Sequence, residues 1–152
     1  MALTTGAAQA TCYADTPLTR PDERYQAVEG SNGAEVKDSV TGLVWQRCGL
    51  GQTWDGNSCT GTITPQDFPT ATKAAAAAKP WRLPTQAELD GLIEKSCTKP
   101  ALNSHWFGSG PTGWVWTATD MGSPDGSVVI NTETGIIANF IKKLPLYVRW
   151  VK

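Results

Sequence analysis

Residues 81–89 read WRLPTQAEL, and this stretch decides where the helical part of the chain begins. Thr85 and Glu88 are spaced as a capping box, in which the two side chains bond free backbone N–H groups at a helix start. Leu89, Leu92 and Ile93 follow at spacings of three and four, which is typical of one buried helix face. We therefore predict a helix after Thr85 that ends near residues 95–97. The preceding stretch, ATKAAAAAK at 71–79, predicts a second helix that ends before Pro80 and does not extend back across Pro69.

Strands surround these helices on both sides. Alternating polar and apolar residues between turn signals predict strands at 24–28, 35–40, 43–47, 113–119, 127–131, 136–141 and 146–151. The order is a β-hairpin, two helices and then further antiparallel strands. That order predicts an α+β fold with the helices packed on antiparallel strands.

Composition limits the classes of protein that fit. The chain has 152 residues, 40% of them hydrophobic, with a net charge of −1. This length predicts a single domain over 11–152, and the charge argues against a nucleic-acid partner, which usually meets a basic surface. No apolar run reaches the roughly 20 residues of a membrane span. The 15 glycines and 10 prolines exclude a long coiled coil.

Four cysteines, Cys12, Cys48, Cys59 and Cys97, indicate the compartment. None is in a C-x-x-C pair, and an even number suits two disulfides formed in an oxidising environment. We favour Cys48–Cys59, because a Gly-rich loop joins them, and then Cys12–Cys97; four buried free thiols are the alternative. Residues 1–10 end in a small-x-small pattern and are predicted to be a signal-peptide remnant or a disordered leader. The predicted location is secreted, periplasmic or at the cell surface.

Four blocks of the chain together resemble one family. They are DSVTGLVW at 38–45, WRLPT with Glu88-Leu89 at 81–89, WTAT at 116–119 and YVRWVK at 147–152. In this order they are similar to the Lcl C-terminal domain, named for a bacterial collagen-like adhesin, and the likeness covers about residues 24–152. Thr117, Ala118 and Lys152 depart mildly from the family pattern.

The resemblance also carries expectations about fold and function. The 82–88 block and the C-terminal block resemble the formylglycine-generating-enzyme and variable-lectin group, which implies a C-type-lectin-like fold. The adhesin binds sulfated glycosaminoglycans, which implies a non-catalytic recognition domain for a carbohydrate or a surface protein, in adhesion or surface assembly. A structural subunit that forms a homo-oligomer is the alternative. An enzyme of the formylglycine-generating type is a remote one, because no cysteine follows Cys97 to supply its chemistry.

Candidate ligand residues fall in the C-terminal half. Trp116 is expected in the core, whereas Trp114 and the loop of Asn103, His105 and Trp106 are candidates for an exposed aromatic site. Lys142, Lys143 and Arg149 form the one compact basic patch, while a neutral glycan or a protein partner is equally compatible with this slightly acidic chain. Asp120 and Asn139 complete the set of candidate ligand residues.

No catalytic residue and no cofactor are predicted. Calcium is the one metal left open, because oxygen-bearing side chains that suit it cluster in this half. The tripeptide patterns of calcium-binding lectins are missing. The oxygen-bearing residues are Asp120, Asp125, Asn131, Glu133 and Asn139.

Overall fold

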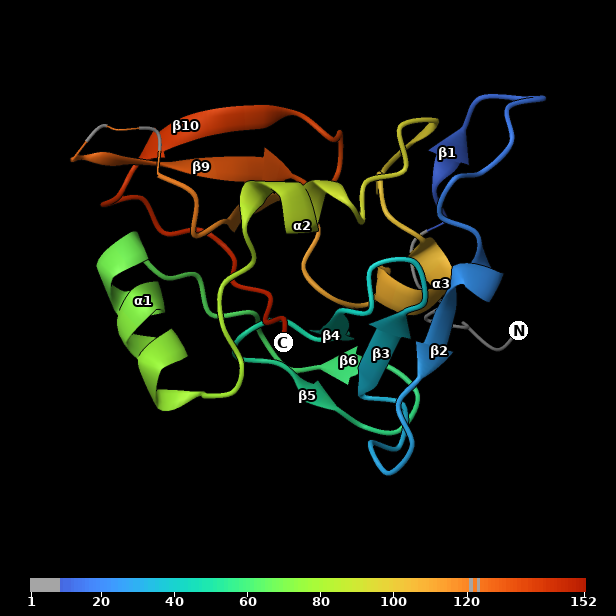
Figure 1. Cartoon of the computed structure of the whole chain (residues 1–152), viewed down its shortest axis with the longest axis horizontal. Helices are drawn as coiled ribbons and strands as arrows, with labels where there is room; N and C mark the ends of the chain where they lie inside the picture. The colour runs from blue at the N-terminus through green and yellow to red at the C-terminus, as the bar shows by residue number, and fades with distance from the viewer. Residues whose placement is uncertain (1–8, 121, 123) are drawn as a thin grey trace.

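A computed structural model describes residues 9–120, 122 and 124–152 of the chain. Most of the expected leader, residues 1–8, lies outside the described residues. The described part combines three α-helices and one 3-10 helix with short antiparallel strands in four small sheets, which confirms the α+β class. Figure 1 shows helix α2 near the centre, between the β9–β10 hairpin on one side and the β2–β3–β4 sheet on the other.

The first three-stranded sheet confirms the predicted N-terminal hairpin. It contains β2 (Tyr25–Ala27), β3 (Glu35–Asp38) and β4 (Val44–Gln46), which pair in that order. Val36 lies opposite Trp45 in the ladder, and both side chains are fully buried. The 3-10 helix η1 (Asp22–Arg24) leads into β2. The alternation of buried and exposed residues therefore marks the face that packs on the core.

The second three-stranded sheet confirms the predicted C-terminal hairpin. Its order is β10 (Ile137–Ile141), β9 (Gly126–Asn131) and β8 (Trp114–Trp116). The central strand β9 is buried along nearly its whole length, because side chains pack on both of its faces. The edge strand β10 alternates exposed and half-buried residues.

The helices begin as local chemistry dictates but differ from prediction in length. Helix α1 (Phe68–Ala77) starts earlier than expected, because Asp67 caps it and Pro69 lies in the first turn, where no N–H is needed. Helix α2 (Gln86–Asp90) has the predicted capping box at Thr85 and Glu88. It ends at Asp90, so the predicted extension to 95–97 is wrong. Glycine follows at 91, and Glu94 turns to bond the N-terminal arm at Thr19 and Arg20.

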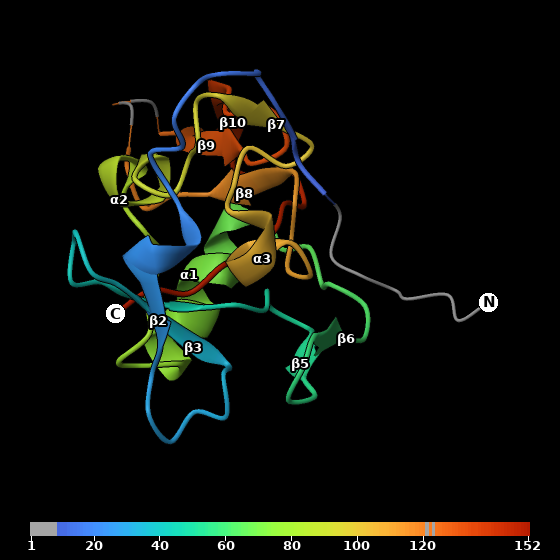
Figure 2. The same ribbon diagram turned by 90° about the vertical axis from the view of Figure 1, so that its right-hand side faces the viewer.

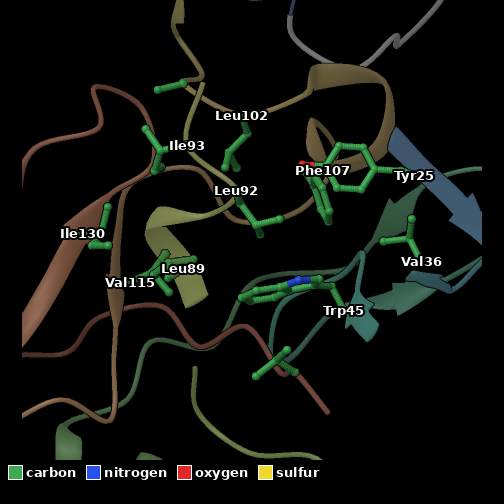
Figure 3. Packing of buried hydrophobic residues seen from close by; sticks show 12 residues of the cluster. Tyr25, Val36, Trp45, Leu89, Leu92, Ile93, Leu102, Phe107, Val115 and Ile130 are labelled. Carbon is green, nitrogen blue, oxygen red and sulfur yellow. The ribbon is translucent and has the colours of Figure 1, made fainter. Parts of the chain in front are cut away.

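The core consists of two clusters of buried side chains. The first surrounds Trp45 and contains Leu89, Leu92, Phe107 and Ile130 (Figure 3). Leu92 lies outside the helix but is fully buried, so the apolar spacing identified the core face even where the helix has ended. The second cluster includes the predicted core residue Trp116.

Two disulfides hold short ribbons to this core. Cys12–Cys97 joins β1 (Thr11–Cys12) to β7 (Cys97–Thr98). Cys48–Cys59 ties the ribbon of β5 (Thr53–Trp54) and β6 (Cys59–Thr60) to the segment that follows β4. Both predicted pairings are confirmed. Two disulfides are typical of proteins outside the cytoplasm and indicate an extracytoplasmic chain. None of the helices in the described residues has the length and apolar character to cross a membrane.

The last segment of the chain departs from prediction. Residues 146–151 were expected as a strand, but they make only single bridges, such as Val151 with both Trp45 and Arg82. Val148, Trp150 and Val151 are buried. The apolar alternation here reflects a segment that crosses the core between separate partners, not a ladder with one neighbour.

Candidate functional site

A cavity of about 450 Å³ opens on the side of the molecule that carries α3 (Ser104–Phe107). Its walls come from three segments that are distant in sequence: the loop before β3, the β5–β6 turn and α3. Figure 2 shows α3 and the β5–β6 ribbon on the same side of the molecule, with β2 and β3 beside them. Arg47, directly after β4, lines the cavity between these segments.

The β5–β6 ribbon holds Trp54 as one wall. The Asp55 carboxylate accepts hydrogen bonds from the backbone N–H groups of Asn57 and Ser58, which shapes the tight turn at the tip. These bonds lower the pKa of Asp55, because they favour its charged form. The Trp54 indole N–H donates to the carbonyl of Asn32 at 2.8 Å. The Trp54 ring is therefore held both by its own ribbon and by the loop before β3.

Helix α3 holds Trp106 as the facing wall. Asn103 caps the helix by accepting from the Trp106 backbone N–H, and its amide donates to Asp22 and to the carbonyl of Arg20. The Trp106 indole N–H donates to the carbonyl of Asp22. The His105 ring packs edge-on against Trp106, with 5.2 Å between centroids. The short helix thus presents His105 and Trp106 in fixed positions.

The Arg47 guanidinium lies between the two indoles. Its centre is 4.2 Å from the Trp54 ring and 5.0 Å from the Trp106 ring. It donates to the backbone carbonyls of Trp106, His105 and Gly33. These bonds use three of its five N–H donors. Within the described residues no carboxylate lies within ion-pair distance of Arg47. Burial lowers the pKa of Arg47, which stays charged near neutral pH.

A second arginine lies beneath the first. Arg149 is fully buried, and its guanidinium donates to the carbonyls of Gln46, Arg47 and Pro111. Burial and the nearby Arg47 charge lower the pKa of Arg149 to about 9. Gly110 packs against the Arg47 carbonyl and the Arg149 guanidinium with no room for a side chain. Two positive charges therefore lie close together here, Arg47 in the cavity wall and Arg149 buried next to its backbone, although the chain as a whole is slightly acidic.

This arrangement suits recognition of a polar ligand with a flat apolar face. Two anchored indoles offer aromatic surface, and Arg47 offers two further N–H donors. Asn32, Asn57, Ser58 and His105 surround them with groups able to bond hydroxyls. A concave site with aromatic walls and a few oriented polar groups is the usual form of a small-ligand site.

Sequence reasoning found part of this site. Of the candidate ligand residues, His105 and Trp106 line the cavity, while Asn103 is a buried helix cap with its side-chain donors used inside the protein. Arg47 and Trp54 were missed. The signal for Trp54 was its place in the Gly-rich loop that the Cys48–Cys59 disulfide closes, and Arg47 directly precedes that loop.

The predicted basic patch does not exist as one surface. Lys142 and Lys143 line a separate hollow of about 510 Å³ beside the start of α1. Arg149 is 0% exposed, so its proposed role as a surface partner of these lysines is wrong. A guanidinium can be buried here because three backbone carbonyls accept its hydrogen bonds, and the sequence spacing carries no sign of that.

The other candidates lie apart from the cavity. Trp114 is half-buried and packs on Phe140 with 4.5 Å between ring centroids. The Asp120 carboxylate accepts from the backbone of Gly122 in an exposed turn, and Asn139 is exposed on β10. None of these residues contacts the Arg47 cavity.

The oxygen-bearing residues considered for calcium are divided between the two ends of the β9–β10 hairpin, with Asn131 and Glu133 at the turn and Asp125 at the opposite end. The Asn131 side chain accepts from the backbone of Glu133 and so shapes the β9–β10 turn. Among residues 9–120, 122 and 124–152, no group of three or more His, Cys, Asp or Glu side chains is placed to hold a metal ion.

Fold and site together define a small, disulfide-bonded α+β domain with an aromatic and arginine-lined surface cavity. Comparison with protein-family models identifies the family: residues 34–152 match the Lcl C-terminal domain, and the chain belongs to it. This confirms the family suggested by the sequence blocks. Searches of curated proteins and of solved structures found no match.

Proposed function

We propose that this chain is a non-catalytic recognition domain, secreted, periplasmic or at the cell surface, that binds a carbohydrate in the Arg47 cavity. The observation that carries the proposal is the Arg47 guanidinium, held between two anchored tryptophans with two N–H donors unused. A sugar ring has an apolar C–H face that suits an indole and hydroxyl groups that suit arginine and amide side chains. Adhesion or surface assembly is the setting that this recognition would serve.

The electrostatics favour a sugar with an acidic substituent. Burial and the nearby charge of Arg47 lower the pKa of Arg149, and neither arginine has a carboxylate partner among the described residues. An arginine fork matches a carboxylate or sulfate group through two parallel hydrogen bonds. A ligand anion would supply the counter-charge that the protein itself does not place there.

Two further considerations support recognition over chemistry. All four cysteines are in disulfides, so the thiol chemistry of the remote enzymatic alternative has no free cysteine to use. The site also lies on loops and short elements that project from a packed core. That placement agrees with a C-type-lectin-like display of ligand-binding loops, which we propose as the finer description of the fold.

The test is a glycan array that includes neutral, sulfated and carboxylated saccharides, probed with wild type and matched variants. Trp54→Ala and Arg47→Gln are expected to weaken binding at least about tenfold. Arg47→Gln should also remove most of the salt dependence of saccharide binding. Lys143→Ala is the control, because it removes a cation from the other hollow and should leave the affinity of a single site for a monovalent saccharide unchanged.

Each outcome decides between surfaces. Loss of binding in Lys143→Ala with Arg47→Gln unaffected would place the ligand at the lysine hollow and overturn the proposal. A chain that binds no saccharide on the array would overturn it in favour of a surface-protein partner. Thermal unfolding of each variant must match wild type to within a few degrees for the comparison to count.

A further inference from the structure

A second surface of the molecule lies at the edge strand β10, away from the Arg47 cavity. Seven large hydrophobic side chains are exposed in the described residues, and four of them fall within residues 136–144. Ile136 and Ile141 are each 56% exposed, Ile137 is 42% and Leu144 is 38%. Figure 1 shows β10 as the outer strand beside β9. Exposed apolar residues gathered this closely are unusual for a free surface and mark an interaction site.

The backbone of β10 offers hydrogen bonds along this edge. The N–H of Lys142 donates to Asp125, and the carbonyl of Ile136 accepts from Asn131. Since every second residue of an antiparallel strand bonds the same neighbour, the even-numbered residues face β9. Ile137, Asn139 and Ile141 therefore direct their backbone groups away from the sheet. The stretch IIANFI at 136–141 has no charge or proline to block pairing.

The charges at the two ends of the strand fit a second copy of the same strand in antiparallel orientation. Glu133 lies in the turn before β10, and Lys142 and Lys143 follow its end. A two-fold axis at Asn139 would place Ile137 of one copy opposite Ile141 of the other. It would also bring Lys143 of one copy to the same end as Glu133 of the other. The lysine hollow, which Ile141 and Pro69 also line, would then receive the exposed Ile136 turn of the second copy.

We infer that this chain forms a reversible two-fold dimer through antiparallel pairing of β10 with β10 of a second copy. The pairing would make one continuous six-stranded sheet, with about six hydrogen bonds between the copies. A five-residue edge buries less surface than a standard stable interface, so the dimer is weak and concentration-dependent. The Arg47 cavity is elsewhere on each copy, so the dimer would present two ligand sites and raise avidity for a repeating ligand.

The test is sedimentation equilibrium of the full chain from about 1 μM to about 1 mM. Wild type is expected to rise toward twice the mass of one chain. Asn139→Pro should shift that rise to at least about tenfold higher concentration. The Asn139 N–H points outward, so proline leaves the bonds with β9 intact. Val40→Lys is the control: it charges an apolar residue that is 72% exposed elsewhere, and it should change nothing.

Charge reversal tests the register itself. Lys143→Glu and Glu133→Lys should each weaken the dimer, and the double variant should restore it, because the opposite charges meet again across the two-fold axis. A wild-type chain that stays monomeric throughout the range would overturn the inference. A dimer that is insensitive to Asn139→Pro, or a mass that exceeds two copies, would do the same. Arg47→Gln should leave the mass unchanged, so failure of this inference is separate from failure of the glycan proposal.

Discussion

Arg24 and Arg47 lie at opposite ends of the same three-stranded sheet but in opposite electrostatic settings. Arg24 makes a two-point contact with Asp38, and the side chains are 9% and 1% exposed. Arg47 contacts only carbonyls and two indole faces. The hydrogen bond with Asp38 raises the pKa of Arg24, whereas burial lowers that of Arg47. The charge of Arg24 is neutralised within the fold, whereas that of Arg47 has no carboxylate partner among the described residues.

The surroundings of each arginine extend the contrast. Near Arg24, the buried Glu94 carboxylate accepts from the backbone of Thr19 and Arg20, and Cys12–Cys97 ties the same N-terminal arm to the core. Near Arg47, Cys48–Cys59 ties down the ribbon that carries Trp54. The polar groups of the Arg24 region are therefore bonded to one another within the fold, while the Arg47 region is a rigid frame around an open cavity. Rigid positioning of groups with unused bonding capacity is what a binding site requires.

The two disulfides give the largest expected effects and separate stability from binding. Cys12–Cys97 spans 85 residues and Cys48–Cys59 spans 11. The chain-entropy model predicts losses of about 4.5 and about 3 kcal/mol when each pair is replaced by serines. Urea unfolding measures both. Glycan binding should be lost only in the Cys48→Ser/Cys59→Ser variant. Loss of binding in the other variant while it remains folded would contradict the assignment of the two regions.

The arginine comparison gives the next effect. Asp38→Asn leaves Arg24 buried without its partner and should cost about 3 kcal/mol of the free energy of unfolding. Arg47→Gln breaks no ion pair but loses some of the hydrogen bonds to backbone carbonyls and the contact with two indoles, so its cost should be about 1–2 kcal/mol, below that of Asp38→Asn. Chemical denaturation of the two variants checks both values. Equal losses would mean that Arg47 holds the fold together as much as Arg24 does, and that its cavity is structural.

Acid should destabilise the Arg24 region most, because the two buried carboxylates with a lowered pKa, Asp38 and Glu94, both lie there. Burial would raise the pKa of Asp38, but hydrogen bonds from Arg24 and from the backbone of Val40 outweigh it and leave the pKa below its usual value. The same balance holds for Glu94, where the backbone of Arg20, the Ser96 hydroxyl and Thr19 supply the bonds. A depressed folded-state pKa stabilises the protein above the ordinary carboxyl pKa of about 4. That stability is lost as the pH falls through the folded-state value.

The measurement is the unfolding midpoint from pH 7 downward. Wild type should hold its midpoint above about pH 5 and lose it progressively below about pH 4. Glu94→Gln should start lower and fall less steeply, because it no longer takes up that proton on unfolding. A variant that keeps the full wild-type slope would show that Glu94 is not one of the groups responsible.

Local chemistry predicted the fold elements better than their ends. The capping box, both hairpins, both disulfide pairings and the core role of Trp116 are confirmed. Each depends on neighbours in sequence or on plain apolar character, except Cys12–Cys97, which follows once Cys48 and Cys59 are paired. The end of α2 and the C-terminal segment were missed, because tertiary contacts decide them. Glu94 bonds the arm 75 residues away instead of continuing the helix.

The site was predictable only in part, for a related reason. His105 and Trp106 stand in a polar loop and could be found as candidates. Arg149 has the same formal charge as Lys143, and only the backbone carbonyls that fold around it distinguish a buried arginine from an exposed one. Arg47 is similar: its importance comes from two tryptophans that lie 7 and 59 positions away along the chain. Sequence spacing alone does not show that these three side chains come into contact.

The smallest expected effect comes from the WRLPT block, and it tests whether this block belongs to the Arg24 region or to the Arg47 region. Thr85 and Glu88 form the cap of α2, and Glu88 also pairs with Arg82 at 2.7 Å. Thr85→Ala removes one capping bond at an exposed position and should cost about 1 kcal/mol. Thr85→Ser, which keeps the hydroxyl, should cost much less. Neither variant should change glycan affinity, because Thr85 contacts neither the cavity nor its walls. Weaker binding at unchanged stability would instead make this helix start part of the recognition surface, and the contrast between the two arginine regions would then describe only part of the site.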